Sequence, residues 1–264
     1  MNFEEIKIKL DESYINVIKF GCGSKNMVII SGISLCGLEG QGKTIADAYK
    51  IFADEYRVFL FERKKDLSKN YAIDTMADDI YNAINKLNIK SAYFYGVSQG
   101  GMIAQKLAVK HPQAVQKLAL CSTVCRVNKT ITNVLNNWIK YAEICDVVSL
   151  NRQFAKDVFS KDYHMRFKDA FLQWENVGTA DDCKRFCILA KSILNFDIYE
   201  QINKIKCPVL ALGSEKDSVT GRDGILEIIN KLKCDSYIYN QYGHAVYDEA
   251  PDIKERIKKF FDMC

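Results

Sequence analysis

The sequence has little proline and histidine and no long hydrophobic run. Three prolines in 264 residues, with no low-complexity tract, argue against disordered linkers. The opening segment MNFEEIKIKL lacks the apolar core of a signal peptide. No run approaches the ~18 consecutive apolar residues of a membrane-spanning helix. These absences argue against secretion and membrane insertion, so we expect a globular cytoplasmic protein without a membrane span.

The cysteines and histidines do not show the spacing of a metal site. None of the ten cysteines forms a C-x-x-C pair, and several lie in apolar runs, where a free thiol packs as a small hydrophobic group. The three histidines, His111, His164 and His244, are far apart in the sequence. We therefore expect free thiols in a reducing compartment, no metal and no organic cofactor.

The composition is that of an ordinary globular protein with a substantial core. Hydrophobic residues make up 48% of the chain and charged residues 27%, and the net charge is only +4. Short basic clusters occur at Arg63-Lys64-Lys65 and between Arg256 and Lys259. Neither extends into a long basic run, so we expect solvated faces and no nucleic-acid partner.

Short apolar segments alternate with helix-like segments along most of the chain. The predicted strands cover residues 6–10, 14–20, 27–31, 57–61, 92–97, 117–121, 208–212 and 236–239. The predicted helices cover residues 45–55, 75–87 (capped by Asp74), 99–110, 224–232 and 251–261. This alternation is typical of an α/β protein with a mostly parallel sheet covered on both faces. The first two strands are predicted to form an antiparallel hairpin.

Residues 124–202 break this alternation. They contain no clear strand and hold both tryptophans and many other aromatic residues. We predict a core formed by residues 1–123 and 203–264, with 124–202 as a helical cap inserted at one end of the sheet. The cap aromatics Trp138, Tyr141, Phe154, Phe159, Phe167, Phe171 and Trp174 would suit a small apolar or aromatic group. Helical spacing of such residues equally serves packing, so none is assigned as a substrate contact.

Two glycine-rich patterns compete for the role of functional site. Gly37 to Thr44 reads GLEGQGKT, which matches the phosphate-loop pattern G-x-x-x-x-G-K-[ST]. Gly96-Val97-Ser98-Gln99-Gly100 matches G-x-S-x-G and lies between a predicted strand and a predicted helix. A sharp strand-to-helix turn lifts the serine hydroxyl clear of the sheet, and the glycines allow close backbone approach.

A nucleophilic serine needs a base and an acid that orients the base. His244 follows the last predicted strand and precedes the last helix, whereas His111 and His164 have no comparable position. We therefore predict His244 as the base. Asp217 lies on the loop after strand 208–212 at the same edge of the sheet, and Glu215 is the alternative acid.

Ser98, Asp217 and His244, in that order, resemble the catalytic triad of the α/β-hydrolases. The segments YGVSQGGMIAQKLAVKHP, CPVLALGSEKD and YGHAVYDEAPD are similar to that superfamily's nucleophile, acid and histidine segments. The resemblance implies an esterase- or lipase-like serine hydrolase with a helical cap. Serine at the turn argues against the superfamily's haloalkane dehalogenases and epoxide hydrolases.

The resemblance gives the glycine-rich loop a role other than nucleotide binding. In such hydrolases the loop after the third strand provides one backbone N–H of the oxyanion hole, here Ile33, and the residue after the nucleophile, here Gln99, provides the other. The chain has Ser31-Gly32 where the family usually has His-Gly. A phosphate loop would also need a magnesium-binding acid after a second strand, and Glu62 is the only candidate. We expect Lys43 to be a solvated residue in the first turn of a helix.

The predicted function is hydrolysis of a small to medium carboxylic ester, thioester or amide, with a small-molecule acyl substrate. Three alternatives remain open at this point. The same triad could serve an acyltransferase or perhydrolase, the scaffold could bind a ligand without catalysis, or the phosphate-loop pattern could bind a nucleotide. The substrate, the bond that is cleaved and the oligomeric state do not follow from the sequence.

Overall fold

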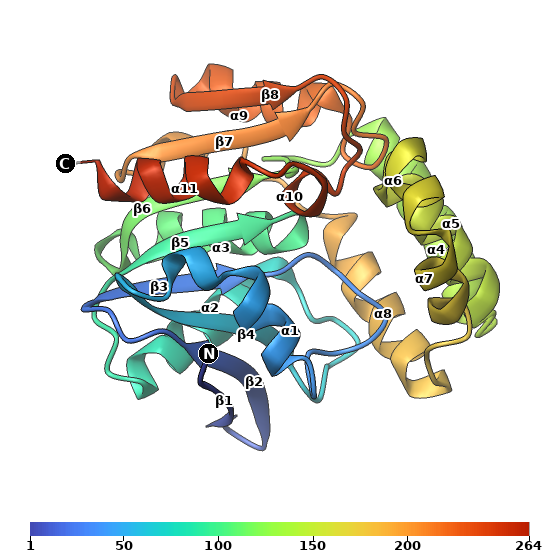
Figure 1. Ribbon diagram of the computed structural model, residues 1–264, viewed down its shortest axis with the longest axis horizontal. Coiled ribbons are helices and arrows are strands. Elements are labelled where there is room, and N and C mark those ends of the chain that lie inside the picture. Colours follow the sequence, from blue (N-terminus) through green and yellow to red (C-terminus); the bar gives the residue numbers. More distant parts are fainter. Residues whose placement is uncertain (264) are drawn as a thin grey trace.

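The computed structural model describes residues 1–263 and contains an eight-stranded sheet in the order β1-β2-β4-β3-β5-β6-β7-β8 (Figure 1). β1 and β2 pair antiparallel, β2 pairs antiparallel with β4, and all later neighbours are parallel. The strands are β1 (Phe3–Leu10), β2 (Ser13–Phe20), β3 (Lys25–Ile30), β4 (Tyr56–Lys64), β5 (Ala92–Val97), β6 (Val115–Cys121), β7 (Val209–Ser214) and β8 (Asp235–Tyr239). The predicted fold class, including the N-terminal antiparallel hairpin, is confirmed.

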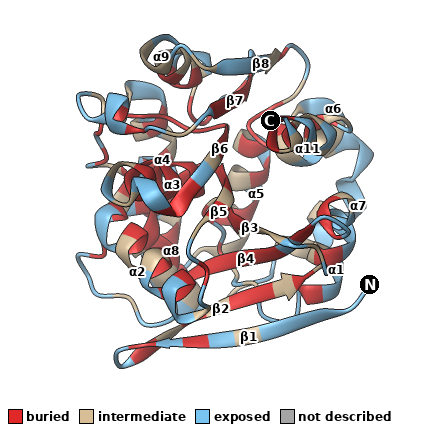
Figure 2. Cartoon of the chain, turned by 90° about the vertical axis from the view of Figure 1, so that its left-hand side faces the viewer, coloured by how far each residue is buried: buried red, intermediate tan, exposed pale blue. Residues whose placement is uncertain are grey.

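The central strands are apolar along their whole length because both faces of the sheet are covered. The last four residues of β3 and of β5, and all of β7, are buried, whereas the edge strands β1 and β8 are largely exposed (Figure 2). One face packs against α2 (Ile73–Lys86), α3 (Gln99–Lys110) and α9 (Arg222–Leu232). The other packs against α1 (Gly42–Ala48) and α11 (Ile253–Asp262).

A helical insert lies beyond the carboxyl ends of the strands (Figure 1). It contains α4 (Lys129–Glu143), α5 (Val147–Val158), α6 (Lys161–Arg166), α7 (Lys168–Trp174) and α8 (Ala180–Ile193). Polar side chains fix where four of these helices begin, because each accepts a hydrogen bond from a free amide of the first turn. These N-caps are Asn128, Asp146, Ser160 and Thr179.

Two helix predictions needed correction. The helix expected over 45–55 ends at Ala48 and is followed by the short 3₁₀ helix η1 (Lys50–Phe52), because the carbonyls of Ala53 and Glu55 accept from Cys22 and Lys25. Asp74 is not the cap of α2; it lies in the first turn, and its carboxylate pairs with Lys106 Nζ at 3.1 Å. The helix predicted over 251–261 is present as α11, and a short helix that was not predicted, α10 (Val246–Glu249), precedes it.

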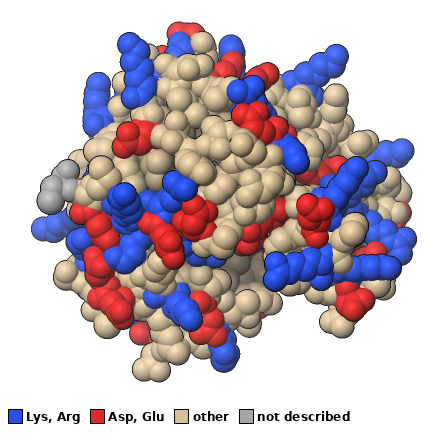
Figure 3. Space-filling model, turned by 45° about the horizontal axis from the view of Figure 1, so that its top comes forward, with Lys and Arg blue, Asp and Glu red and all other residues tan. Residues whose placement is uncertain are grey.

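Acidic and basic side chains are interspersed on the face shown in Figure 3, as the small net charge leads one to expect. Within residues 1–263, none of the helices combines the length and the apolar character that crossing a membrane requires. Two further 3₁₀ turns, η2 (Pro112–Ala114) and η3 (Ile202–Lys204), precede β6 and β7.

Candidate active site

Ser98 stands at the sharp turn between β5 and α3, in a left-handed backbone conformation with φ 52° and ψ −120°. This conformation is unfavourable for a residue with a Cβ and therefore needs support from its surroundings. The amide of Ser98 donates to the Cys121 carbonyl at 2.9 Å, and its carbonyl accepts from the Gly101 amide at 2.9 Å. Both neighbouring elements thus hold the serine in place.

The glycines of the G-x-S-x-G pattern are required by close backbone approach. A Cβ placed on Gly100 would lie 2.0 Å from the carbonyl oxygen of Ile30, the last residue of β3. A Cβ on Gly96 would lie 2.7 Å from the Gly100 carbonyl oxygen. The turn can therefore pack against β3 only when these positions lack side chains, which agrees with the reason predicted for them.

Ser98, His244 and Asp217 meet in a buried line of hydrogen bonds. Ser98 Oγ lies 3.0 Å from His244 Nε2, and His244 Nδ1 lies 3.0 and 2.9 Å from the two carboxylate oxygens of Asp217. The exposed fractions of the three residues are 7%, 2% and 7% respectively. The hydroxyl, imidazole and carboxylate thus have the arrangement of a nucleophile, its base and the group that orients the base.

Asp217 is held as a carboxylate despite its burial. Burial by itself raises the pKa of Asp217, but the His244 imidazole and the hydrogen bonds from Thr220 outweigh it and lower this pKa below its ordinary value. Its oxygens accept from the amides of Val219 and Thr220 at 2.9 Å each and from Thr220 Oγ1 at 2.6 Å. The alternative acid, Glu215, instead pairs with Arg222 Nε at 2.9 Å.

Ser122 and Thr123, which follow β6, bind the backbone of two triad residues. No role was predicted for them from the sequence. Ser122 Oγ donates to the His244 carbonyl at 2.7 Å, and Thr123 Oγ1 donates to the Ser98 carbonyl at 2.7 Å. The only feature of the sequence that pointed to Ser122 and Thr123 was their position directly after a buried strand. They contribute by fixing backbone positions.

Ile33 and Gln99, the predicted oxyanion donors, lie at the start of the loop after β3 and at the start of α3. Within residues 1–263, neither amide N–H has a hydrogen-bond acceptor. A Cβ on Gly32 would lie 3.3 Å from Ser98 Cβ, so this loop passes directly beside the serine. Free amides next to a nucleophile suit a developing negative charge.

Arg63 corrects the expectation of a solvated basic cluster, because it is only 4% exposed. Its guanidinium donates to the Ser31 carbonyl at 2.6 Å and to Gln99 Oε1 at 2.8 Å, so it joins the loop after β3 to the residue after the nucleophile. Burial, followed by repulsion from Arg185, lowers the pKa of Arg63 to about 10, which leaves it charged at neutral pH. The signal available in the sequence was an arginine near the end of a strand with an apolar centre.

The match to the phosphate-loop pattern does not form an open anion site. The amides of Gly40 and Gly42 both donate to the Glu5 carboxylate, at 3.0 and 2.8 Å. A Cβ on Gly42 would meet the ring of Phe3 at 2.4 Å, so the loop is packed against β1. Lys43 is exposed, as predicted, and pairs with Asp47 at 2.9 Å. The chain's own carboxylate thus occupies the amides that a phosphate would need.

The other two histidines lie outside the site. His111 stacks on Tyr81 with ring centroids 3.5 Å apart and is partly buried. His164 stacks on Phe171 in the helical insert, at 4.7 Å. No group of three or more His, Cys, Asp or Glu residues in the described chain has a metal-binding arrangement.

The histidine loop contacts the helical insert directly. The Ala245 amide donates to the Val158 carbonyl at 2.8 Å, and Glu249 accepts from the Ser160 amide at 2.8 Å. A Cβ on Gly243 would lie 2.8 Å from both the Ser160 nitrogen and the Val158 oxygen. Gly243 therefore allows the close approach of the histidine loop to the insert.

A cavity of about 480 Å³ opens between the loop after β3 and the helical insert. Seven of its fifteen lining residues are aromatic, and its only charged side chain is Asp248 of α10. Trp138 does not reach it, because this side chain is buried in the insert and donates to Asp157 Oδ2 at 2.9 Å. The residues that line the cavity are Ser31, Gly32, Ile33, Ser34, Leu38, Phe154, Val158, Phe159, Tyr163, Phe167, Ala170, Phe171, Trp174, Tyr247 and Asp248.

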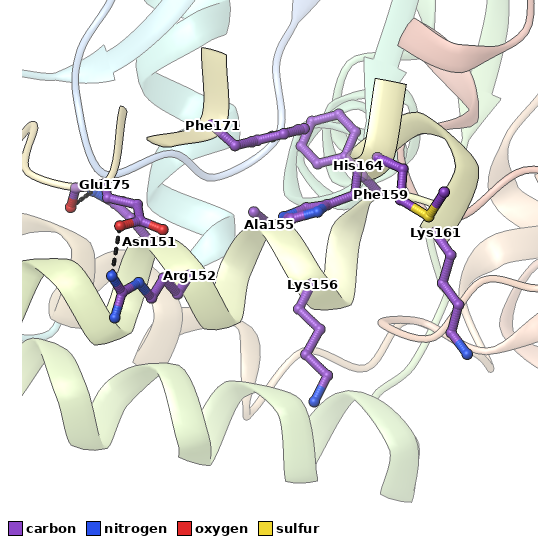
Figure 4. A pocket seen from close by; sticks show the side chains of 10 residues that line it. Asn151, Arg152, Ala155, Lys156, Phe159, Lys161, His164, Phe171 and Glu175 are labelled. Atoms are coloured by element: carbon purple, nitrogen blue, oxygen red, sulfur yellow. Dashed lines mark hydrogen bonds and ion pairs between the residues drawn. The ribbon is translucent and has the colours of Figure 1, made fainter. Parts of the chain in front are cut away.

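A second cavity, of about 470 Å³, lies within the insert between α5, α6 and α7 (Figure 4). Phe159 and Phe171 line both cavities, with ring centroids 5.0 Å apart. In Figure 4, Lys156 and Lys161 extend away from these two rings, and Arg152 is paired with Glu175 at 2.8 Å. The second cavity touches neither the triad nor the loop after β3.

Comparisons with known proteins agree with this architecture. The profile of the family described as alpha/beta hydrolase fold matches residues 40–251. RutD of Caulobacter sp. (strain K31), whose name includes the words carbamate hydrolase, is 23% identical over 92% of this chain and 88% of its own. YisY of Bacillus subtilis (strain 168), an AB hydrolase superfamily protein, is 25% identical over 73% of this chain and 74% of its own.

Solved structures show the same fold. The enol-lactonase from Burkholderia xenovorans LB400 superimposes with a TM-score of 0.85 at 17% identity, covering 98% of this chain and 100% of its own. The esterase from Exiguobacterium antarcticum gives a TM-score of 0.82 at 18% identity, over 98% and 100% of the two chains. The chain therefore belongs to the alpha/beta hydrolase fold family.

Proposed function

We propose that the protein is a serine hydrolase that cleaves small to medium carboxylic esters, or related thioesters and amides. The observation that carries the proposal is the 3.0 Å contact between Ser98 Oγ and His244 Nε2, with Asp217 on the other imidazole nitrogen. The names of the relatives extend the candidate bonds to carbamates and enol lactones. The free thiols fit a reducing compartment, so the cytoplasm is the proposed location.

The geometry of the site supports the following mechanism. His244 takes the Ser98 proton as Oγ attacks the carbonyl carbon, and Asp217 stabilises the imidazolium. The tetrahedral oxyanion is bound by the amides of Ile33 and Gln99, and a side-chain donor in such a position contributes about 3–4 kcal/mol to transition-state stabilisation. His244 then protonates the leaving group. Water, activated by the same imidazole, releases the acid from Ser98 and regenerates the enzyme.

Residues 124–202 are proposed to act as a cap that shapes the acyl pocket. The support is the position of Phe154, Phe159 and Trp174, which line the cavity beside the loop after β3. Pockets of this kind, mostly apolar with a few polar groups, are typical of small-molecule sites. Transfer of the acyl group to an alcohol or to peroxide would use the same residues, and analysis of the products with these acceptors distinguishes the alternatives.

The acid member of the triad provides a matched test. Hydrolysis of p-nitrophenyl acetate and butyrate is measured for the wild-type protein, Asp217→Asn and the control Glu215→Gln. Loss of the orienting acid in a Ser-His-Asp enzyme costs about 10⁴-fold in kcat, so we expect a loss of that order for Asp217→Asn. Glu215→Gln, which removes the Arg222 partner, should retain most of the activity. Equal activity of all three proteins would contradict the proposed mechanism.

A further inference from the structure

The cavity beside the nucleophile has a chemical character that the triad does not explain. Seven of its fifteen lining residues are aromatic, and they lie on α10 and on three of the five insert helices, α5, α6 and α7, or at the ends of these helices. Among the side chains that line it, none is basic and one is acidic, Asp248. Aromatic faces attract cations through their quadrupole, and a carboxylate adds a full negative charge.

Asp248 is not used by any other part of the described chain. Its side chain takes part in no hydrogen bond and no ion pair within residues 1–263, whereas its neighbour Glu249 binds the Ser160 amide. It is exposed and lies on α10, the short helix that begins two residues after His244. The side chain is therefore free to meet a group of the substrate.

The residues that line the cavity suit a substrate that places a charge away from the bond that breaks. Gly32 and Ile33, at the proposed oxyanion hole, line the same cavity as Asp248 and Trp174. An ester carbonyl at Ser98 would leave the rest of the molecule among the rings. A volume of about 480 Å³ accommodates a small ester with a bulky head group.

We infer that the preferred substrates are esters or thioesters that carry an organic cation, such as a substituted ammonium group, bound between the aromatic rings and Asp248. This inference rests on the proposed serine hydrolase function and specifies its substrate class. The charge acts in binding and does not enter the chemistry. Ser98 Oγ forms the acyl bond as the bond to the leaving group breaks, and water then yields the free acid.

A pair of substrates of equal shape tests the inference. Acetylthiocholine carries a quaternary nitrogen, and S-(3,3-dimethylbutyl) thioacetate has a neutral carbon in its place. The ratio of kcat/KM for the charged to the neutral thioester is measured by thiol release. We expect a ratio of about ten or more for the wild-type protein, because desolvated cation–π contacts and one carboxylate act together. A ratio of one or less would overturn the inference.

Variants of Asp248 test whether this residue causes the preference for the charged thioester. In Asp248→Asn the ratio should fall about tenfold, and Asp248→Glu should restore part of it. The control Asp54→Asn removes an equal charge from an exposed turn before β4, at the opposite end of the sheet, and should leave the ratio unchanged. A ratio that is equal in the wild type and Asp248→Asn would overturn the role of this residue, whether or not both proteins are active.

Failure of the inference can be distinguished from failure of the proposed function. Hydrolysis of the neutral thioester that is lost in Ser98→Ala, without preference for the charged one, would refute the cation site alone. Absence of hydrolysis for both thioesters, together with no covalent labelling of Ser98 by a fluorophosphonate, would refute the hydrolase. Inhibition by tetramethylammonium, compared with neopentyl alcohol, provides a readout of binding that does not depend on turnover of a thioester.

Discussion

The Arg63 guanidinium joins the two segments that we propose as oxyanion donors, since it binds the Ser31 carbonyl and the Gln99 side chain. We expect Arg63→Met to lower kcat about 10²-fold with little change in KM, because small displacements of catalytic groups have effects of that size. Steady-state kinetics on a p-nitrophenyl ester, with folding checked by circular dichroism, measures the change.

The matched control is Lys65→Met, which removes a charge from the same cluster at an exposed position. This variant should keep the wild-type kcat. Arg63→Lys retains the charge but not the paired donors, so an intermediate kcat is expected. A folded Arg63→Met protein with unchanged kcat would show that Arg63 serves stability alone.

Asp248 makes the expected cation preference depend on pH. Although Asp248 is accessible to a ligand, the protein packed around its carboxyl group desolvates it and raises the pKa of Asp248 to about 6, with a smaller opposing effect of Lys254. Below that pH the group becomes neutral, so the ratio of charged to neutral thioester hydrolysis should fall as the pH decreases from 8 to 5. Titratable groups that interact with it are Tyr49, Tyr95, Cys121, Tyr163, Tyr247, Glu249 and Lys254.

Use of the ratio removes any effect of pH on the chemical steps, which are common to both substrates. In Asp248→Asn the ratio should be independent of pH over the same interval. A decrease of equal size in the variant and the wild type would assign the pH dependence to another group.

A site residue could be predicted from the sequence where a short pattern around it identifies its role. Ser98 and His244 lie in short patterns with a physical meaning, and the acid could be narrowed to Asp217 or Glu215 by its place after a strand. Ser122, Thr123 and Arg63 act through contacts with residues distant in sequence. Nothing in their own neighbourhoods specifies those partners, so the sequence alone could not assign them.

At the scale of elements, the turn between β5 and α3 depends on the absence of a side chain at Gly100. An alanine in a helix normally stabilises it by about 1 kcal/mol relative to glycine. At Gly100 the added Cβ would lie 2.0 Å from the Ile30 carbonyl oxygen. We therefore expect Gly100→Ala to lower the free energy of unfolding by about 3 kcal/mol or more, since overpacking that moves backbone has costs of this size.

Urea denaturation provides the measurement, and Gly40→Ala is the control. Gly40 has a positive φ of 77° but no atom within 4 Å of an added Cβ, so it tests backbone strain without a clash. Its cost should be about 1–2 kcal/mol. If Gly100→Ala is as stable as the wild type, the close packing of this turn on β3 is not required.

Periodicity predicted the elements well where local pattern and tertiary packing agree. The buried strands and α3 follow directly from their apolar runs. The prediction for the segment after α1 was wrong because the carbonyls of Ala53 and Glu55 accept hydrogen bonds from the amides of Cys22 and Lys25, which are distant in sequence. The start of α2 was misplaced for a similar reason, since Asp74 pairs with Lys106 of α3 and does not cap its own helix.

At the scale of the whole molecule, Asp262 connects the last helix to the sheet. Its carboxylate accepts from Tyr56 OH at 2.7 Å and from Lys258 Nζ at 2.5 Å. Burial would raise the pKa of Asp262, but the hydrogen bonds from Lys258 and Tyr56 outweigh it and lower the pKa to about 2. A lowered carboxyl pKa stabilises the fold above the unfolded value of about 3.9, and this contribution is lost as the pH falls toward 2.

We therefore expect Asp262→Asn to lower the free energy of unfolding by about 1–2 kcal/mol at neutral pH, after allowing for partial exposure of the group. The difference from the wild type should decrease between about pH 4 and about pH 2. Urea denaturation at several pH values measures this, with the exposed Asp235→Asn as control. A difference in unfolding free energy that does not change with pH would indicate that the packing of the Asp262 side chain, and not its charge, holds α11 against the sheet.

The topology of the sheet brings the three triad residues together from positions far apart in the chain. β5, β7 and β8 run parallel, so the loops after them meet at one edge, as the sequence order of strands and helices predicted. The cavity could not be predicted in the same way. Its wall combines residues 31–38, the helical insert and α10, and the relative positions of these segments depend on packing across the whole molecule.

Covalent labelling with a fluorophosphonate tests the central claim, an activated Ser98, most directly. Mass spectrometry of the digested protein should locate one adduct on the peptide that contains Ser98. The adduct should be absent in Ser98→Ala and strongly reduced in His244→Ala, because the imidazole takes the hydroxyl proton. A folded wild-type protein that gains no adduct, or gains it at another residue, would contradict the account.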